Sequence, residues 1–265
     1  MTKTLNYYII DVFTDQRFSG AQIAVFPHAD DLNDSQMATI AKELNLSETV
    51  FASQQDEHDE TRRMRTFSPL KEIDFAGHPI IATAYALGEC GDIKLKDGVT
   101  PISFVQNTGK IAVNISAKNG NVSFVQFTDK VSSVIDRFTP PDAELADILS
   151  INASDIDHTK FATRLVSCGY PYLIVPVWKY ETVREATFNF TAWSHSSAPQ
   201  SAAQEILLFS PKTAHKDSNF HARCMGLIVG IHSDPAVGSA MPAFASYLTS
   251  FDVTQEGTHT FAVDR

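Results

Sequence analysis

Two glycine-led stretches, one in each half of the chain, constrain the fold most. Gly77 of Ala-Gly-His-Pro and Gly238 of Val-Gly-Ser-Ala are each followed five residues later by alanine and ten residues later by leucine. Each stretch joins a strand-rich region to a run of small residues with helical character. A chain of 265 residues is also long for a single core. The sequence therefore predicts two pseudo-symmetric domains, residues 1–129 and 130–265, with a crossover near the adjacent prolines Pro140 and Pro141.

Switches in hydrophobic period divide each half into strands and helices. A helix over residues 33–45 is predicted, capped by Asn33 or Asp34, and Glu48 follows it at the start of a strand. A small-residue helix is predicted from Gly77 to Leu87. Strands of the first half are predicted at 7–13, 21–26, 49–53, 62–67, 102–106, 111–117 and 121–128. The second half is predicted to contain helices near 141–150 and 180–193, strands at 162–167, 171–177, 205–209 and 219–225, and a final helix that ends at 248.

Charge and cysteine content limit the partners and the compartment. The formal net charge is −10 and no basic block is present, which argues against nucleic acid and anionic membrane surfaces as partners. The N-terminal residues have no signal-peptide pattern, and the longest uncharged run, residues 165–178, is too short for a membrane span. Three widely separated cysteines indicate a reducing compartment rather than a disulfide framework. We therefore expect a cytoplasmic protein.

Glu48 and His78 are the residues that most suggest chemistry. Glu48 is the one acid in an uncharged run, and we expect burial to raise its pKa. His78 follows a glycine turn at the start of a helix, where an imidazole can donate to a substrate or carry a proton. Such a pair suits an enzyme that transfers protons without a cofactor. Two structural alternatives remain open: Glu48 could pair with an arginine among residues 62–65, and His78 could only cap its helix.

Four separated motifs carry a resemblance to a known family. They are the opening Ile-Asp-Val-Phe-Thr with Phe-Ser-Gly, the Asn-Leu-Ser-Glu-Thr run, the stretch from Phe67 to Pro79, and Ser-Asp-Pro-Ala-Val-Gly-Ser-Ala ending at Ala240. In this order they resemble the PhzF-like phenazine-biosynthesis family, which has the diaminopimelate-epimerase fold. The resemblance implies an α+β fold of two similar domains, each a mixed sheet or barrel around a central helix. The active site of the family lies between the two domains.

The resemblance also implies an activity and a set of site residues. The best-known activity of the family isomerises trans-2,3-dihydro-3-hydroxyanthranilic acid by moving a proton, without metal or organic cofactor. The family's catalytic residues fall on Glu48, His78 and Asp234 of this chain. Ser47 and the helix openings at Gly77, Gly238 and Ser239 are implied to bind a small carboxylic acid substrate. Relatives often form homodimers, so a homodimer is a further expectation.

Alternative functions, structural roles for two site residues and departures from the family pattern stand beside this interpretation. Racemases of the same fold carry a cysteine at each glycine turn, where this chain has Ala76 and Val237, so a two-thiolate racemase is the weaker alternative. A small-acid-binding protein without turnover is the rival from another class. Asp234 could be a turn residue and Ser239 a helix cap. This chain has Gly20-Ala21-Gln22 where relatives have Gly-Asn-Pro, Ser233 where they tend to have Glu, and a changed Arg-x-Phe-x-Pro stretch at residues 223–227. Either the chain is shortened at its C-terminus or its C-terminal wall differs, so the second half of the predicted site is expected to differ from that of relatives.

Overall fold

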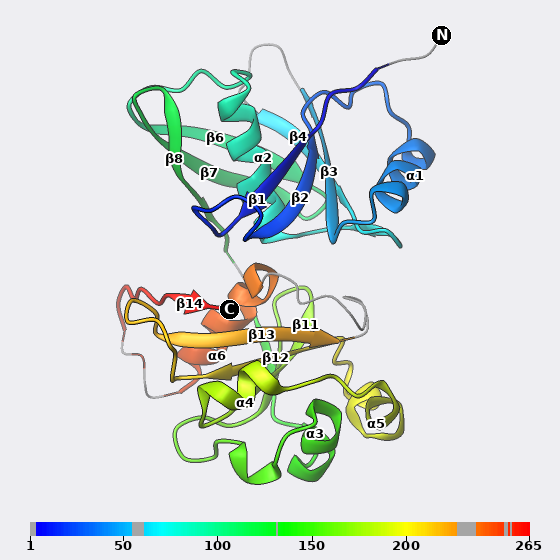
Figure 1. Ribbon diagram of the computed structural model, residues 1–265, viewed down its shortest axis with the longest axis vertical. Helices are drawn as coiled ribbons and strands as arrows, with labels where there is room; N and C mark the ends of the chain where they lie inside the picture. Colours follow the sequence, from blue (N-terminus) through cyan, green and yellow to red (C-terminus); the bar gives the residue numbers. More distant parts are fainter. Residues whose placement is uncertain (1–3, 55–60, 131, 227–236, 252–253, 255) are drawn as a thin grey trace. The chain divides into compact units, whose positions relative to one another are not determined.

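The computed structural model describes residues 4–54, 61–130, 132–226, 237–251, 254 and 256–265. The chain separates into two compact units, unit 1 with residues 1–130 and unit 2 with residues 131–265. Both units contain a curled sheet and helices, as Figure 1 shows, so the fold is α+β as predicted. No helix in the described ranges has the length and apolar character needed to cross a bilayer.

Unit 1 is built on one sheet whose strands run in the order β1-β2-β3-β4-β6-β7-β8, with β5 paired to β4. The strands are β1 (Tyr8–Val12), β2 (Ala21–Phe26), β3 (Glu48–Gln54), β4 (Thr61–Phe67), β5 (Glu72–Ile73), β6 (Gly98–Gln106), β7 (Gly109–Lys118) and β8 (Asn121–Thr128). Helix α2 (Gly77–Glu89) contacts both edge strands, β1 and β8, as well as strands between them. The sheet therefore curls around α2, as Figure 1 shows.

Small side chains allow α2 to lie inside this sheet. Ala82, Ala84 and Ala86 are buried, and Ile80 and Leu87 pack with them in the main core of unit 1. Gly88 is required for close approach, because a Cβ there would lie 2.7 Å from a methyl group of Val122 on β8. The small-residue pattern of the sequence thus sets the distance between the central helix and the sheet.

Helix α1 (Asp34–Leu44) covers the other face of the sheet and leads the chain to Glu48. Its N-cap is Asn33, whose side chain accepts from Gln36 N while the Gln36 side chain accepts from Asn33 N, which completes a capping box. Its C-cap, Asn45, has φ of 51°, the left-handed conformation that ends many helices. Because the helix ends there, Glu48 becomes the first residue of β3.

Unit 2 has a sheet of six strands in the order β14-β13-β12-β11-β10-β9. The strands are β9 (Val134–Asp136), β10 (Arg164–Ser167), β11 (Pro171–Pro176), β12 (Glu205–Ser210), β13 (Phe220–Gly226) and β14 (Val263–Asp264); the α-helices are α3 (Asp142–Leu149), α4 (Tyr180–Glu185), α5 (Phe190–His195) and α6 (Met241–Thr249). Alternate residues of β11 enter two different cores: Leu173 packs with α3 and α5, and Ile174 packs with α6. The sheet of unit 2 therefore lies between two helical layers.

Two expected helices of unit 2 differ from the prediction. The stretch at 180–193 forms two short helices, because Arg223 Nη1 donates to the carbonyls of Val183, Arg184 and Ala186 at the end of α4, while Asn189 caps α5. Gly238 does not begin the last α-helix. It lies in the 3₁₀ turn η3 (Val237–Ala240), and α6 begins after it.

Candidate functional site

Glu48 and His78 form a hydrogen-bonded pair in unit 1. Glu48 begins β3 and His78 is the second residue of α2, and these two elements pack against each other. His78 Nε2 lies 2.8 Å from Glu48 Oε2. The His78 side chain is 2% exposed and that of Glu48 is 13% exposed. The structure thus brings together two residues that lie 30 positions apart in the sequence and that the sequence analysis had singled out.

The expectation of a raised pKa for Glu48 is wrong, because the net shift is downward. Burial does raise it, but the charge of His78, the hydrogen bond with His78 and a hydrogen bond from the Ser47 side chain outweigh burial. Together they lower the pKa of Glu48 from its ordinary value of 4.5. Glu48 is therefore a carboxylate at neutral pH, ready to accept a proton rather than to donate one.

The remaining contacts of His78 define its orientation. Its second ring nitrogen, Nδ1, is buried and has no hydrogen-bond partner within the described part of the chain. Among the residues that the structure describes, the hydrogen bond between Nε2 and Glu48 is therefore the polar contact that orients the His78 ring. The imidazole also packs beside Phe13, with ring centroids 6.4 Å apart and the planes inclined by 48°.

The start of α2 adds backbone donors next to this pair. The N-cap is Ala76, which has no side chain able to cap the helix, and no acidic residue lies in the first turn. The first N–H groups of a helix lack intrahelical partners and lie at the positive end of the helix dipole. Gly77 and His78 supply such groups beside the His78 side chain. This helix start is therefore suited to an anionic group of a ligand.

The alternative in which Glu48 pairs with an arginine of β4 is not what the structure shows. The contacts of Glu48 are with His78 and Ser47. Arg65 instead binds Glu72 through Nε and Nη2, at 2.8 and 2.7 Å, and Asp34 through Nη1 at 2.6 Å.

The predicted site residues of unit 2 are only partly described. Ser239 lies in η3, where Tyr172 OH donates to its Oγ at 3.0 Å, and Gly238 precedes it in the same turn. Burial raises the pKa of Tyr172, which keeps its hydroxyl protonated as a donor. Asp234 falls outside the described residues.

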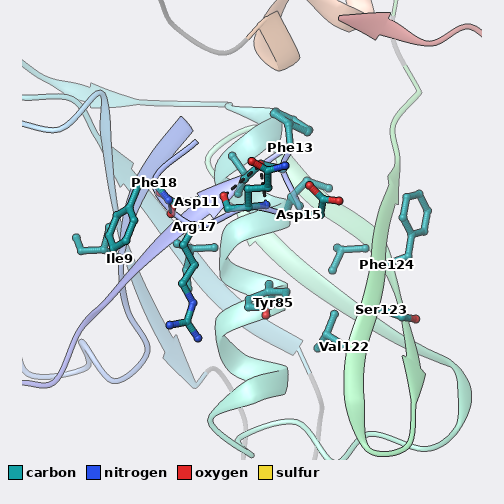
Figure 2. Close-up of a pocket in the computed structure, with 16 residues that line it drawn as sticks. Ile9, Asp11, Phe13, Asp15, Arg17, Phe18, Tyr85, Val122, Ser123 and Phe124 are labelled. Atoms are coloured by element: carbon teal, nitrogen blue, oxygen red, sulfur yellow. Dashed lines mark hydrogen bonds between the residues drawn. The ribbon is translucent and has the colours of Figure 1, made fainter. Parts of the chain in front are cut away.

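A groove of about 540 Å³ lies elsewhere on unit 1, along β1, α2 and β8. Figure 2 shows Phe13, Tyr85 and Phe124 among its lining side chains, together with Arg17 and Asp15. Neither Glu48 nor His78 lines this groove, so it is distinct from the carboxylate–imidazole pair. Phe13 is common to both, since it lines the groove and contacts His78.

Sequence reasoning missed Phe13 and Tyr172 as neighbours of site residues. Phe13 belongs to the Ile-Asp-Val-Phe-Thr motif, so a signal was present, although nothing in the motif indicates a contact with His78. Tyr172 lies in an apolar strand and gives no comparable signal.

Comparison with known proteins identifies the class and then the family. The two curled sheets, each with packed helices, define a diaminopimelate-epimerase-like α+β fold. The PhzF-family phenazine biosynthesis protein of Bacillus anthracis has this fold, with a TM-score of 0.84 and 23% identity over 97% of this chain and 83% of that one. The model of the phenazine biosynthesis-like protein family matches residues 10–264. The chain belongs to this family.

Relatives of this chain carry isomerase names. An uncharacterized isomerase of Mesorhizobium japonicum is 31% identical over 96% of this chain and 84% of its own length. The trans-2,3-dihydro-3-hydroxyanthranilate isomerase of Pseudomonas aeruginosa is 36% identical over 40% of this chain and 39% of its own length. The family and these names support an isomerase-type function for this chain.

Proposed function

We propose that this protein is an isomerase that moves a proton within a small cyclic or unsaturated carboxylic acid, with Glu48 as the acid–base residue. The observation that carries this proposal is the 2.8 Å hydrogen bond between His78 Nε2 and Glu48 Oε2 in a buried environment. A carboxylate held in one orientation and kept ionised is a general base whose position and protonation state are both fixed.

The proposed reaction has two proton transfers. Glu48 takes a proton from a substrate carbon next to an unsaturated or carboxylate group, and the electron pair of the broken C–H bond moves into that group. Protonated Glu48 then returns the proton to a different carbon of the same substrate. The atoms and electrons balance without an oxidant or reductant, and the product is an isomer of the substrate. General acid–base catalysis of this kind contributes about 10²–10⁴-fold.

The start of α2 is proposed to hold the negative charge of the substrate. The uncapped N–H groups of Gly77 and His78 can donate to its carboxylate or to the oxyanion that forms when the proton leaves. Because such donors are fixed by the helix, they need no reorganisation during the reaction. Roles for Ser47, Asp234, Gly238 and Ser239 in binding or catalysis stay predictions.

The substrate class rests on the named relative as well as on the site. The name of the Pseudomonas aeruginosa enzyme gives its substrate as trans-2,3-dihydro-3-hydroxyanthranilate, a partly saturated ring that carries a carboxylate. We carry over the class, a ring or conjugated acid with a removable C–H proton, and not the compound. A two-thiolate racemase remains the weaker alternative, since Cys90 caps the end of α2 opposite to His78, roughly 18 Å along the helix.

Hydrogen–deuterium exchange tests the proposal directly. A pool of small cyclic and unsaturated acids, including trans-2,3-dihydro-3-hydroxyanthranilate, is incubated with the protein in D₂O and analysed by mass spectrometry. We expect deuterium to enter at least one acid with the wild-type protein and to fall by about 10²–10⁴-fold with Glu48→Gln.

Glu43→Gln is the matched control. Glu43 is an exposed residue of α1, so the same chemical change there should leave exchange unaffected. Equal exchange in wild type and Glu48→Gln would contradict the assigned role of Glu48. A pool in which ligands bind but no acid gains deuterium would favour the binding protein without turnover, and loss of exchange after thiol alkylation would favour the racemase.

A further inference from the structure

We propose that Phe13 is a positioning residue for His78: its ring fixes the rotation of the imidazole so that Nε2 faces Glu48. The expected effect of this positioning on catalysis rests on the proposed function. The placement of the ring itself can be tested without any activity.

His78 lacks the contact that usually orients a histidine. A functional imidazole is normally fixed by a hydrogen bond on the nitrogen that does not face the reaction partner. Here that nitrogen, Nδ1, is buried and has no partner in the described ranges of the chain. Rotation of the ring therefore has to be restricted by packing. Phe13 is the aromatic ring in contact with the imidazole, at 6.4 Å between centroids.

The backbone at Phe13 is held in an unfavourable conformation. Its φ is 61°, in the left-handed region that a bulky side chain rarely adopts. Its side chain is nevertheless 62% exposed, so burial of its own apolar surface does not explain why the chain accepts this strain. Strain of this kind persists only where the surrounding structure holds the backbone in place. At Phe13 the strained backbone places the ring beside the buried His78 ring.

The turn that carries Phe13 is stabilised by hydrogen bonds and by a close backbone approach at Gly20. Asp11 Oδ2 accepts from Phe18 N at 2.7 Å across the turn, and Thr14 Oγ1 accepts from Gln16 N at 3.0 Å within it. Gly20 closes the turn, because a Cβ there would lie 2.3 Å from the Val12 carbonyl oxygen. The turn between β1 and β2 is therefore a fixed support for the Phe13 ring.

Phe18 provides a matched comparison in the same turn. Its φ is 66°, nearly that of Phe13, and it is 89% exposed. Figure 2 shows Phe13 at one end of α2 and Phe18 pointing away from that helix. The two residues thus share backbone strain and exposure, and Phe13 has the contact with His78.

The test compares Phe13→Gly with Phe18→Gly by NMR of the histidine rings. Glycine accepts the left-handed conformation, so both variants should keep or raise Tm to a similar extent. In ¹⁵N-labelled wild-type protein, the His78 ring, assigned with His78→Gln, should give one sharp set of ring-nitrogen signals, as expected for a single ring orientation. We expect Phe13→Gly to shift or broaden these signals and Phe18→Gly to leave them unchanged.

Activity adds a second readout once a substrate is known. Misplacement of a catalytic group by about 1 Å can cost on the order of 100-fold, so kcat should fall roughly 10- to 100-fold in Phe13→Gly and stay unchanged in Phe18→Gly. Phe13→Leu, which keeps the bulk and the strain but lacks a flat ring, should lie between them. His78 signals in Phe13→Gly that match the wild type would overturn the positioning role. Altered His78 signals without any detectable activity would support positioning and count against the proposed function instead.

Discussion

At the scale of single residues, the protonation of Glu48 depends on a competition between burial and its two polar neighbours. Burial is the largest single influence and raises the pKa of Glu48, while His78 and Ser47 lower it and prevail together. Because the pKa in the folded protein lies below its unfolded value, the ionised carboxylate stabilises the fold above the unfolded pKa. That stabilisation is lost as the pH falls through the folded pKa. The same contacts that keep the base ionised therefore also support the fold at neutral pH.

Replacing His78 should change the pKa shift of Glu48 from downward to upward. In His78→Gln the charge is lost and burial is opposed mainly by Ser47, so the pKa of Glu48 should rise above its ordinary value of 4.5. In Ser47→Ala one weaker influence is removed, so the pKa should rise by less. A ¹³C NMR titration of the glutamate carboxyl groups, with Glu48→Gln to assign the signal, measures both. An unchanged Glu48 pKa in His78→Gln would show that His78 does not control it.

At the scale of elements, Arg65 joins three parts of unit 1 that the sequence separates. It lies on β4 and binds Glu72 of β5 through two parallel hydrogen bonds and Asp34 at the first turn of α1 through a third. The hydrogen bond from Arg65 is the main cause that lowers the pKa of Glu72. The guanidinium thereby fixes β5, the short strand that leads into the turn before α2.

Arg65→Lys should show how much the two parallel hydrogen bonds between Arg65 and Glu72 contribute to the stability of the fold. Lysine cannot form both parallel bonds to Glu72, so we expect the free energy of unfolding to fall by about 1 kcal/mol. Since the pKa of Glu72 is lowered in the folded state, the difference from wild type should shrink as the pH falls through the carboxylate range. Urea unfolding at several pH values measures this. Arg63→Lys, an exposed change on the same strand, is the control and should have little effect.

Elements with local causes could be predicted from the sequence, and those with distant causes could not. Asn33 and Gln36 form a capping box within one helical turn, and Asn119-Gly120 closes the β7–β8 hairpin with both residues at positive φ. In both cases the residues that cause the structure are neighbours in the sequence, so the pattern predicts it. The break between α4 and α5 depends on Arg223, which is far along the chain from both helices. The residues around positions 180–195 therefore give no indication that the helix is interrupted there.

The same distinction applies to the candidate site. Glu48 and His78 stand in motifs that can be read directly, and the structure places them in contact. The sign of the Glu48 pKa shift could not be predicted from burial alone, because it depends on the distance to His78. The ring contact between Phe13 and His78 joins residues from different motifs and is visible only in three dimensions.

At the scale of the whole molecule, the two units have separate cores. The clusters of buried apolar side chains around α1 and α2 are drawn from unit 1, and those around α3, α5 and α6 are drawn from unit 2, among the residues the structure describes. Leu87 of α2 and Leu248 of α6, which occupy matching positions after Gly77 and Gly238, are buried in different cores. Separate cores favour separate cooperative unfolding of each unit.

Leu87→Ala and Leu248→Ala test this as a matched pair, because each truncation of a buried leucine should cost about 2–5 kcal/mol in its own unit. Both tryptophans of the chain, Trp178 and Trp193, lie in unit 2, so tryptophan fluorescence reports on that unit, whereas circular dichroism reports on both. We expect Leu248→Ala to move the fluorescence transition in urea to lower concentration. Leu87→Ala should move part of the circular dichroism transition and leave fluorescence in place. If Leu87→Ala moved the fluorescence transition as far as Leu248→Ala does, the two units would unfold as one cooperative body, and the stability around Glu48 would depend on the core of unit 2 as well as on its own.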